Sequence, residues 1–356
     1  MVFFDVTKTS RQNHASGITR TARRLSESLE SLLGESFVRV VWNNRRRALF
    51  DVTRRRTVMP TCEDWFLTVE AFAPTERSGF QAFLERGDCR FGAVFHDAIP
   101  LRYPEFTWPQ SVARYPSYMK MLSGFDHVFG VSESSCEEFA GYVDWLGGDC
   151  RASISPIQLG ADFLGGERPI GCVDRSELAT ILMVGILEPR KNQVRLLRAC
   201  ERLWKEGCQF GLNLVGRVNP HFGKPLVSEI RRMRRMGRPI DHRGPVDDKE
   251  MAELIRSCRF SIFPSRAEGC GLPVLEALWM GTPCVCSDLP SHRESAEGGG
   301  CRLVDPHGDA AWVRELRILL EGNDLINRLA SEAADRTLPT WTLTADQVIR
   351  VLVSEQ

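Results

Sequence analysis

The chain has 356 residues, which is long for one domain and usual for two, and 43% of them are apolar, enough for two hydrophobic cores. Its 46 basic and 46 acidic side chains cancel, which argues against a protein that coats nucleic acid. No apolar run is long enough to span a membrane, charge appears too early for a secretory signal, and the twelve cysteines include no C-x-x-C pair. We therefore expect a cytoplasmic protein with reduced cysteines.

In the first half, apolar segments at residues 2–6, 37–42, 93–95 and 128–131 predict strands, and Ser134 with Glu137 predicts a helix start. Gly17 lies between the first strand and a helix, where its backbone could meet a phosphate, although a lone glycine there is usually a turn residue. His96 directly follows the third predicted strand, so we expect it at the edge of a sheet. A lone histidine is more often structural than functional.

In the second half, a segment rich in glycine, proline and charge at 164–169 predicts a linker. Beyond it, strands are predicted at 181–184, 212–215, 240–243, 260–263 and 284–287, with helical patterns between most of them. This alternation is typical of a doubly wound α/β domain. A capping pattern at Asp247 and Glu250 places Val246 in a loop whose backbone could bind a nucleotide base.

The loop that begins at Gly185 carries a basic pair at the entrance to a helix. It reads Gly-Ile-Leu-Glu-Pro-Arg-Lys-Asn, and Asn192 is the predicted N-cap. Arg190 and Lys191 would oppose the helix dipole, so their position favours a bound anion over an ordinary solvated pair. A guanidinium beside an ammonium can neutralise the diphosphate of a leaving group.

A second loop of this type joins the strand at 260–263 to a helix whose first turn contains Pro273. Its two glycines, Gly269 and Gly271, allow the backbone to approach a phosphate closely. Glu276 could accept hydrogen bonds from ribose hydroxyls, and Glu268 from those of a second sugar. In isolation, two structural glutamates are the commoner explanation, but the neighbouring basic loop favours a sugar nucleotide.

Three stretches together resemble the retaining glycosyltransferases of family 4. They are Gly-x(4)-Arg-Lys-Asn at 185–192, Pro-Ser-x(2)-Glu-Gly-x-Gly-Leu-Pro-x-Leu-Glu-Ala at 264–277, and Gly-Thr-Pro-Cys-Val-Cys-Ser at 281–287. Shorter matches lie at 96–97, 103–105, 305–306 and 340–341. The resemblance implies an α/β protein of the GT-B fold, with two Rossmann-like doubly wound domains facing across a cleft. It assigns residues 1–168 to an acceptor-binding domain, 169–339 to a nucleotide-sugar-binding domain, and 340–356 to a helix that crosses back to the first domain.

The same resemblance implies a hexosyltransferase that retains the anomeric configuration through front-face attack by an acceptor hydroxyl. It implies that His96 bonds the transferred sugar, with Asp97 orienting it, and that Glu268 positions the hexose. Arg190 and Lys191 would support the leaving diphosphate, and no metal or other cofactor is expected because the chain has no Asp-x-Asp motif. The remaining donor-binding positions are Gly17, Gly185, Val246, Gly269, Cys270, Gly271, Leu272 and Glu276.

The version of the phosphate loop in this chain resembles that of bacterial mannosyltransferases of surface-polysaccharide assembly. GDP-mannose is therefore the first expected donor, followed by UDP- or TDP-linked sugars, and the expected acceptor is a saccharide or a lipid-linked saccharide. Ile186 and Cys270 depart from the polar and aromatic residues common in the family, which could alter the choice of donor.

Two other classes of protein fit parts of the pattern. A sugar-nucleotide epimerase would convert the donor without an acceptor, and a non-catalytic scaffold would keep only the fold; the complete set of charged candidates disfavours the scaffold. Arginines at 45–47 and 54–56 are expected to contact either solvent or anionic lipid at the inner face of a membrane. Those at 231–238 are expected to form the solvated face of a helix, and no nucleic-acid partner is expected.

Overall fold

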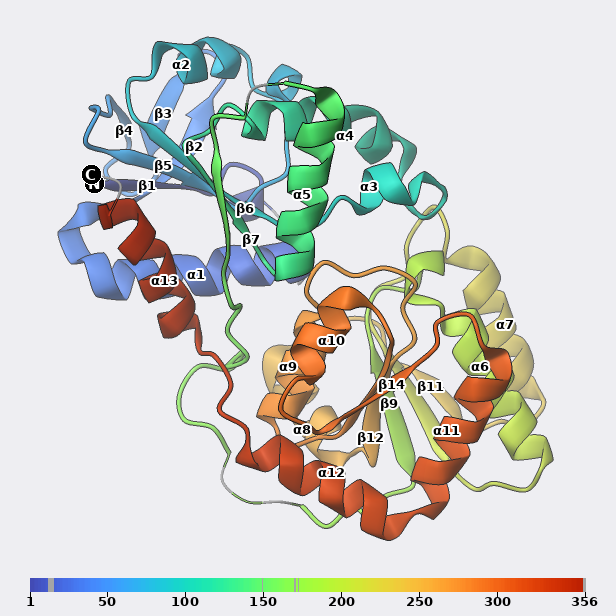
Figure 1. Cartoon of the computed structure of the whole chain (residues 1–356). Helices are drawn as coiled ribbons and strands as arrows, with labels where there is room; N and C mark the ends of the chain where they lie inside the picture. The colour runs from blue at the N-terminus through green and yellow to red at the C-terminus, as the bar shows by residue number, and fades with distance from the viewer. Residues whose placement is uncertain (12–15, 149, 170, 172, 355–356) are drawn as a thin grey trace. The chain divides into compact units, whose positions relative to one another are not determined.

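The computed structural model describes residues 1–11, 16–148, 150–169, 171 and 173–354 (Figure 1). They form two compact units, the first made of Met1–Gly160 with Pro339–Gln356 and the second of Ala161–Leu338. The sequence suggests divisions after residues 168 and 339, whereas the structure divides the chain after 160 and 338. Within the described part, no helix combines the length and apolar character that crossing a bilayer requires. The eleven cysteines there are free thiols, and Cys172 lies outside the described residues.

The first unit contains an eight-stranded sheet in the order β4-β3-β2-β1-β5-β6-β7-β8. The strands from β2 to β8 in this order run parallel, and β3 and β4 form an antiparallel edge. Four of them were predicted, namely β1, β2, β6 and β7. The strand bounds are β1 (Val2–Asp5), β2 (Phe37–Asn43), β3 (Ala48–Asp51), β4 (Arg56–Val58), β5 (Trp65–Thr68), β6 (Arg90–Phe95), β7 (His127–Gly130) and β8 (Ser153–Pro156).

Helices cover both faces of this sheet. The apolar sides of α2, α4 and α5 pack on one face, and α1 lies with α13 on the other (Figure 1). Helix α5 begins two residues earlier than predicted, because Ser132 caps it by accepting from the backbone N–H of Ser135. The helices are α1 (Gly17–Leu33), α2 (Phe80–Arg86), α3 (Ile99–Arg102), α4 (Pro109–Leu122), α5 (Glu133–Leu146) and α13 (Trp341–Ser354), with short 3-10 turns η1 (Thr9–Arg11), η2 (Gly34–Ser36), η3 (Pro74–Glu76) and η4 (Pro104–Phe106).

The helix α13 returns from the end of the chain to complete the first unit. The indole N–H of Trp65 donates to the carbonyl of Leu352 at 3.0 Å, and the Thr344 hydroxyl donates to the carbonyl of Gln158 at 2.6 Å. A side chain at Gly160 would meet the ring of Trp341, since a Cβ there would lie 2.6 Å from its Cγ. The predicted helix after residue 340 is therefore present, and it packs against residues of the first 160.

The second unit contains a six-stranded parallel sheet in the order β11-β10-β9-β12-β13-β14. The five predicted strands are present, and β14 is an additional edge strand. Helices α8, α9 and α10 cover one face, and α6, α7 and α11 the other (Figure 1). The strands are β9 (Thr180–Val184), β10 (Gly211–Val215), β11 (Ile240–His242), β12 (Phe260–Phe263), β13 (Cys284–Ser287) and β14 (Cys301–Val304). The helices are η5 (Pro189–Lys191), α6 (Gln193–Lys205), α7 (Lys224–Arg235), α8 (Asp248–Ser257), α9 (Leu272–Trp279), α10 (Pro290–Ala296), α11 (Asp309–Glu321) and α12 (Asn323–Asp335).

The order of the strands in the second unit fixes which loops become neighbours. From the central strand β9 the chain moves outward through β10 to β11, then returns to β12 on the other side of β9 and continues to β14. The loops after β9 and β12 therefore lie side by side at the carboxyl edge of the sheet. Doubly wound sheets bind ligands at such a switch point.

Candidate functional site

The loops after β9 and β12 are joined by direct hydrogen bonds. The Asn192 side-chain amide donates to the carbonyl of Pro264 at 3.0 Å, and the backbone N–H of Arg266 donates to the carbonyl of Arg190 at 2.8 Å. These bonds bring the basic pair of the first loop beside Glu268 of the second, although the two segments are far apart in sequence.

Arg190, Lys191 and Glu268 form one ion cluster in the second unit. The Lys191 ammonium lies 2.6 Å from Glu268 Oε1, and the Arg190 guanidinium lies 2.9 Å from Glu268 Oε2. The hydroxyl of Ser265 also donates to Oε1, at 2.6 Å. Burial by itself would raise the pKa of the Glu268 carboxyl, but Lys191 and Arg190 outweigh it and hold that pKa well below its ordinary value. Glu268 is therefore an anion at neutral pH, and it neutralises the basic pair in this structure.

Asn192 occupies the predicted N-cap position of α6, although its side chain does not cap the helix. This residue lies just before α6, but its backbone is left-handed (φ 58°) and its side chain makes no cap hydrogen bond. The side chain instead holds the neighbouring loop through Pro264, as described above. Arg190 and Lys191 belong to the 3-10 turn η5 rather than to α6. Proline at the start of this turn and the left-handed residue at its end fix the direction in which the basic pair projects.

Gly185 lies against the stem of the Lys191 side chain. A Cβ at Gly185 would lie 3.4 Å from Lys191 Cε, and its backbone has φ 153°, a conformation that L side chains rarely adopt. The stem of Lys191 therefore lies against the backbone of the loop, and only 8% of the residue is exposed. The loop after β11 contributes Val246, which packs partly buried against the core of the unit.

The glycine loop, residues 268–272, rests on α10. The hydroxyl of Ser291 donates to the carbonyl of Glu268 and that of Ser295 to the carbonyl of Cys270, both at 3.0 Å. Gly271 has φ 78° and precedes α9, and a Cβ there would lie 2.8 Å from Cδ2 of His292. These supporting side chains were not predicted. Their signal in the sequence is the spacing of Ser291 and Ser295, which places them on one face of a helix.

Two further donor-site candidates lie in α9, which begins at Leu272 and contains Pro273 in its first turn as predicted. Leu272 is buried, and Glu276 lies one turn further along the helix with 2% of its surface exposed. The loop N-terminal to α9, with Gly269 and Cys270, thus presents the start of a helix at the sheet edge. The predicted contact between Glu276 and ribose stays a prediction.

His96 and Gly17 lie in the first unit. His96 follows β6 as predicted, and its Nε2 lies 3.0 Å from the carbonyl of Val69, so Nε2 carries the hydrogen of that bond. Burial lowers the pKa of His96 to about 4. A contact with the carbonyl of Val69 thus orients the ring; the Asp97 carboxylate accepts from the N–H of Ile99, and its expected role in orienting His96 stays a prediction. Gly17 is the first residue of α1 and has open space around its Cα.

No group of three or more histidine, cysteine, aspartate or glutamate side chains is arranged to hold a metal ion within the described ranges. The independence from metal stays a prediction.

Solved structures show the fold of the whole chain. Sucrose-phosphate synthase from Thermosynechococcus elongatus superposes with a TM-score of 0.72 at 16% identity, covering 100% of this chain and 99% of that one. Anabaena Alr3699/HepE in complex with UDP and glucose gives a TM-score of 0.67 at 15% identity, with the same coverage. This likeness and the two sheets confirm the predicted GT-B fold with two Rossmann-like domains.

Two relatives by sequence are mannosyltransferases of Escherichia coli. The serotype-specific mannosyltransferase WbdA of Escherichia coli is 30% identical over 217 residues, which are 57% of this chain and 26% of that protein. The O-antigen chain mannosyltransferase B of Escherichia coli is 29% identical over 223 residues, 60% of this chain and 57% of that protein. The chain thus matches about a quarter of WbdA and little more than half of the second relative. Residues 174–336 match the family described as glycosyl transferases group 1, and the second unit is therefore a domain of that family.

Proposed function

We propose that the chain is a retaining hexosyltransferase that moves a sugar from a nucleotide donor to a saccharide or lipid-linked saccharide acceptor in surface-glycan assembly. The observation that carries the proposal is the ion cluster of Arg190, Lys191 and Glu268 at the switch point of the second sheet. Two cations and one carboxylate there match the two ends of a sugar diphosphate, which are an anionic leaving group and a ring of hydroxyls.

GDP-mannose is the proposed donor. Its support is the similarity to the Escherichia coli mannosyltransferases WbdA and O-antigen chain mannosyltransferase B. The structural likeness to HepE, which was solved with UDP and glucose, supports a UDP-hexose as the alternative. The arginines at 45–47, in the turn before β3, and at 54–56, which lead from the turn after β3 into β4, are a proposed contact with anionic lipid at the membrane that carries the acceptor.

The proposed chemistry follows from the charges. Departure of the diphosphate creates negative charge on the leaving group and an oxocarbenium-like sugar, so the cations of Arg190 and Lys191 stabilise the transition state. Glu268 cannot donate a proton at neutral pH because its pKa is low, so its role is to accept hydrogen bonds from the hexose. His96 is neutral and donates from Nε2 to Val69, which leaves Nδ1 as an acceptor for a hydroxyl of the transferred sugar.

Replacement of Lys191 tests this assignment. We expect Lys191→Ala to lower kcat/KM for transfer by about 10²- to 10³-fold, as the loss of one transition-state stabilising group does. Lys205→Ala is the matched control, since Lys205 is an exposed lysine that pairs with Glu201 in the following helix α6. Transfer at the wild-type rate by a well-folded Lys191→Ala protein would exclude the proposed phosphate role.

Product analysis separates the proposal from an epimerase. The protein is incubated with GDP-mannose or UDP-glucose, with and without a saccharide acceptor, and the sugars are identified by chromatography. A transferase forms a new glycoside only when acceptor is present. Conversion of the nucleotide sugar to its epimer without acceptor would replace the proposed function by an epimerase.

A further inference from the structure

The first unit contains a pocket of about 350 Å³ that includes none of the proposed donor-site residues. Its lining includes Lys8, Arg11, Asn44, Glu76 and Arg77. These residues follow the carboxyl ends of β1, β2 and β5, which are neighbours in the sheet. The chain passes from β1 to β2 on one side and later to β5 on the other, so the pocket lies at the switch point of the first sheet.

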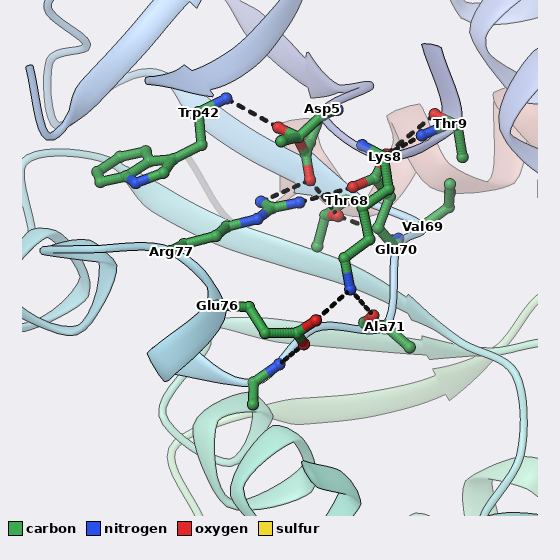
Figure 2. A network of polar contacts seen from close by, with 12 residues as sticks. Asp5, Lys8, Thr9, Trp42, Thr68, Val69, Glu70, Ala71, Glu76 and Arg77 are labelled. Carbon is green, nitrogen blue, oxygen red and sulfur yellow. Dashed lines mark hydrogen bonds and ion pairs between the residues drawn. The ribbon is translucent and has the colours of Figure 1, made fainter. Parts of the chain in front are cut away.

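The deep wall of the pocket is a buried arginine held by two carboxylates. Arg77 is 2% exposed, its Nη1 lies 2.8 Å from Asp5 Oδ2, and its Nη2 lies 2.6 Å from Glu70 Oε2 (Figure 2). The guanidinium also lies over the ring of Phe72, 3.4 Å from the ring centroid. Its Nε is buried and has no hydrogen-bond partner among the residues that the structure describes. Arg77 is thus fixed in place, with Nε unused and Nη1 engaged only in the ion pair with Asp5.

The same buried carboxylates fix the loop after β1. Glu70 Oε1 accepts from the backbone N–H groups of Lys8 and Thr9, each at 2.7 Å. Asp5 Oδ1 accepts from the hydroxyl of Thr7 at 2.5 Å. Lys8 and the neighbouring 3-10 turn η1 are therefore held at the mouth of the pocket before any ligand arrives, which lowers the entropy cost of binding.

The hydrogen-bonding groups that remain in the pocket are donors. The Lys8 ammonium donates to the carbonyl of Ala71 at 2.8 Å and to Glu76 Oε1 at 3.0 Å, which leaves one N–H (Figure 2). Asn44 uses its side-chain oxygen to accept from Ser78, so its NH₂ group remains. Arg11 is exposed and, within the described ranges, its guanidinium contacts no partner.

The acceptor groups of the pocket are already engaged. Glu76 Oε1 accepts from Lys8 and Arg114, and Oε2 accepts from the backbone N–H of Ala73 at 2.7 Å. Asp5 and Glu70 lie behind Arg77 and accept from it and from the β1 loop. A ligand that enters this pocket therefore meets unused N–H groups from a lysine, an arginine and an amide. Such a set suits the oxygens of an anion, because charge-assisted hydrogen bonds are the strongest that these groups can form.

We propose that this pocket binds a phosphate or carboxylate group carried by the saccharide acceptor. Arg11, the spare N–H of Lys8 and the Asn44 amide contact the oxygens of this anion, and Arg77, whose charge is offset by Asp5 and Glu70, forms the fixed wall of the pocket. That the anion belongs to an acceptor rests on the proposed function, whereas the preference for an oxyanion rests on the pocket alone. The acceptor is on this basis an acidic saccharide rather than a neutral one.

Calorimetric titration of the whole protein tests the pocket. The ligands are mannose 6-phosphate for the phosphate source, glucuronate for the carboxylate source, and mannose as the neutral control. We expect at least one charged sugar to bind and mannose not to bind. Arg11→Gln should weaken that binding by about tenfold, the size of one charge-assisted hydrogen bond. Arg86→Gln is the matched control, since Arg86 is also exposed, belongs to the same unit and does not line the pocket.

The outcomes separate the two sources and the two proposals. Binding of mannose 6-phosphate alone identifies a phosphate, and binding of glucuronate alone identifies a carboxylate. Failure of both to bind, or equal affinity in wild-type and Arg11→Gln protein, overturns the pocket proposal. Titration of the wild-type protein with GDP and UDP reports on the second unit: if nucleotides bind and charged sugars do not, the proposed function stands and the pocket proposal fails. If charged sugars bind and nucleotides do not, the proposed donor site is wrong and the proposed anion site stands.

Discussion

At the scale of single residues, Glu268 has two partners that a donor diphosphate would also need. Its oxygens lie 2.6 Å from Lys191 and 2.9 Å from Arg190. On the proposed function, the carboxylate therefore competes with the donor diphosphate for the same cations. The sequence predicted each of the three residues as a site residue but not this pairing, because 77 residues separate Lys191 from Glu268 and only the register of β9 with β12 brings them together.

Glu268→Gln tests that competition. The amide keeps the shape of the side chain and removes its charge, so two cations lose their counter-ion and we expect the protein to lose about 3 kcal/mol of stability. We also expect GDP or UDP to bind at least as tightly as to the wild type, while sugar transfer falls. Urea denaturation, calorimetry and a transfer assay measure the three effects, with Glu253→Gln on the exposed face of α8 as the control. A nucleotide affinity that falls together with transfer would contradict competition for the cations.

The pH dependence of this stabilisation has a definite sign. Because the folded-state pKa of Glu268 is lowered, its contribution is present above the ordinary pKa of 4.5 and is lost as the pH falls. The difference in unfolding free energy between wild type and Glu268→Gln should therefore shrink on acidification. A difference that stays constant down to acidic pH would show that the charge of Glu268 is not its source.

The lowered pKa of His96 gives a second prediction of how stability depends on pH. Its pKa of about 4 lies below the ordinary 6.5, so the folded protein resists protonation that the unfolded chain accepts. The contribution of His96 to stability is therefore complete above pH 6.5 and decreases as the pH falls towards 4. Nuclear magnetic resonance of labelled histidine should show that the His96 ring is neutral at pH 6 and carries its single hydrogen on Nε2. Titration of this ring near pH 6.5 would contradict the burial that the structure shows.

At the scale of elements, the apolar runs predicted most strands inside the sheets and the edge strand β11, whereas the edge strands β4, β8 and β14 and the interior strand β3 were missed. The edge strands β4, β8 and β14 have at most one buried residue each, because an edge strand has one neighbour, and β3 is a short strand with two of its four residues buried, so their patterns are weak. The interior strand β5 was also missed, since its four buried residues follow Glu63 and Asp64 directly. The pocket of the first unit was missed for a related reason, because its polar side chains come from three separate loops with no fixed spacing in the sequence.

The attachment of α13 can be tested through Gly160. A methyl group there would lie 2.6 Å from Cγ of Trp341 and 2.7 Å from the carbonyl carbon of Thr340, so the start of the helix must shift. We expect Gly160→Ala to destabilise the first unit by about 1–3 kcal/mol. Gly141→Ala in α5 is the matched control, because no atom lies within 4 Å of its added Cβ; we expect it to leave stability unchanged or raise it by up to about 1 kcal/mol. Equal stability of the two variants in denaturant would show that α13 is not seated there.

At the scale of the whole molecule, each of the two units has its own sheet and its own buried core. A ligand that binds only one unit should therefore protect that unit from local opening. We expect GDP or UDP to slow hydrogen exchange in the loops at residues 185–192 and 268–272, measured by mass spectrometry on the intact protein. If exchange slows only in the first unit, the nucleotide binds there and not in the second unit, which would contradict the proposed donor site.

The return of α13 to the first unit also determines the order in which the protein can be completed on the ribosome. Domains usually fold as they emerge, with the N-terminal one first. Here residues 161–338 contain all of the second unit, whereas the first unit still needs the helix at Trp341–Ser354. The unit that is synthesised first must therefore be finished last, and a nascent chain that stops near residue 338 would leave Trp65 without the carbonyl partner that Leu352 provides.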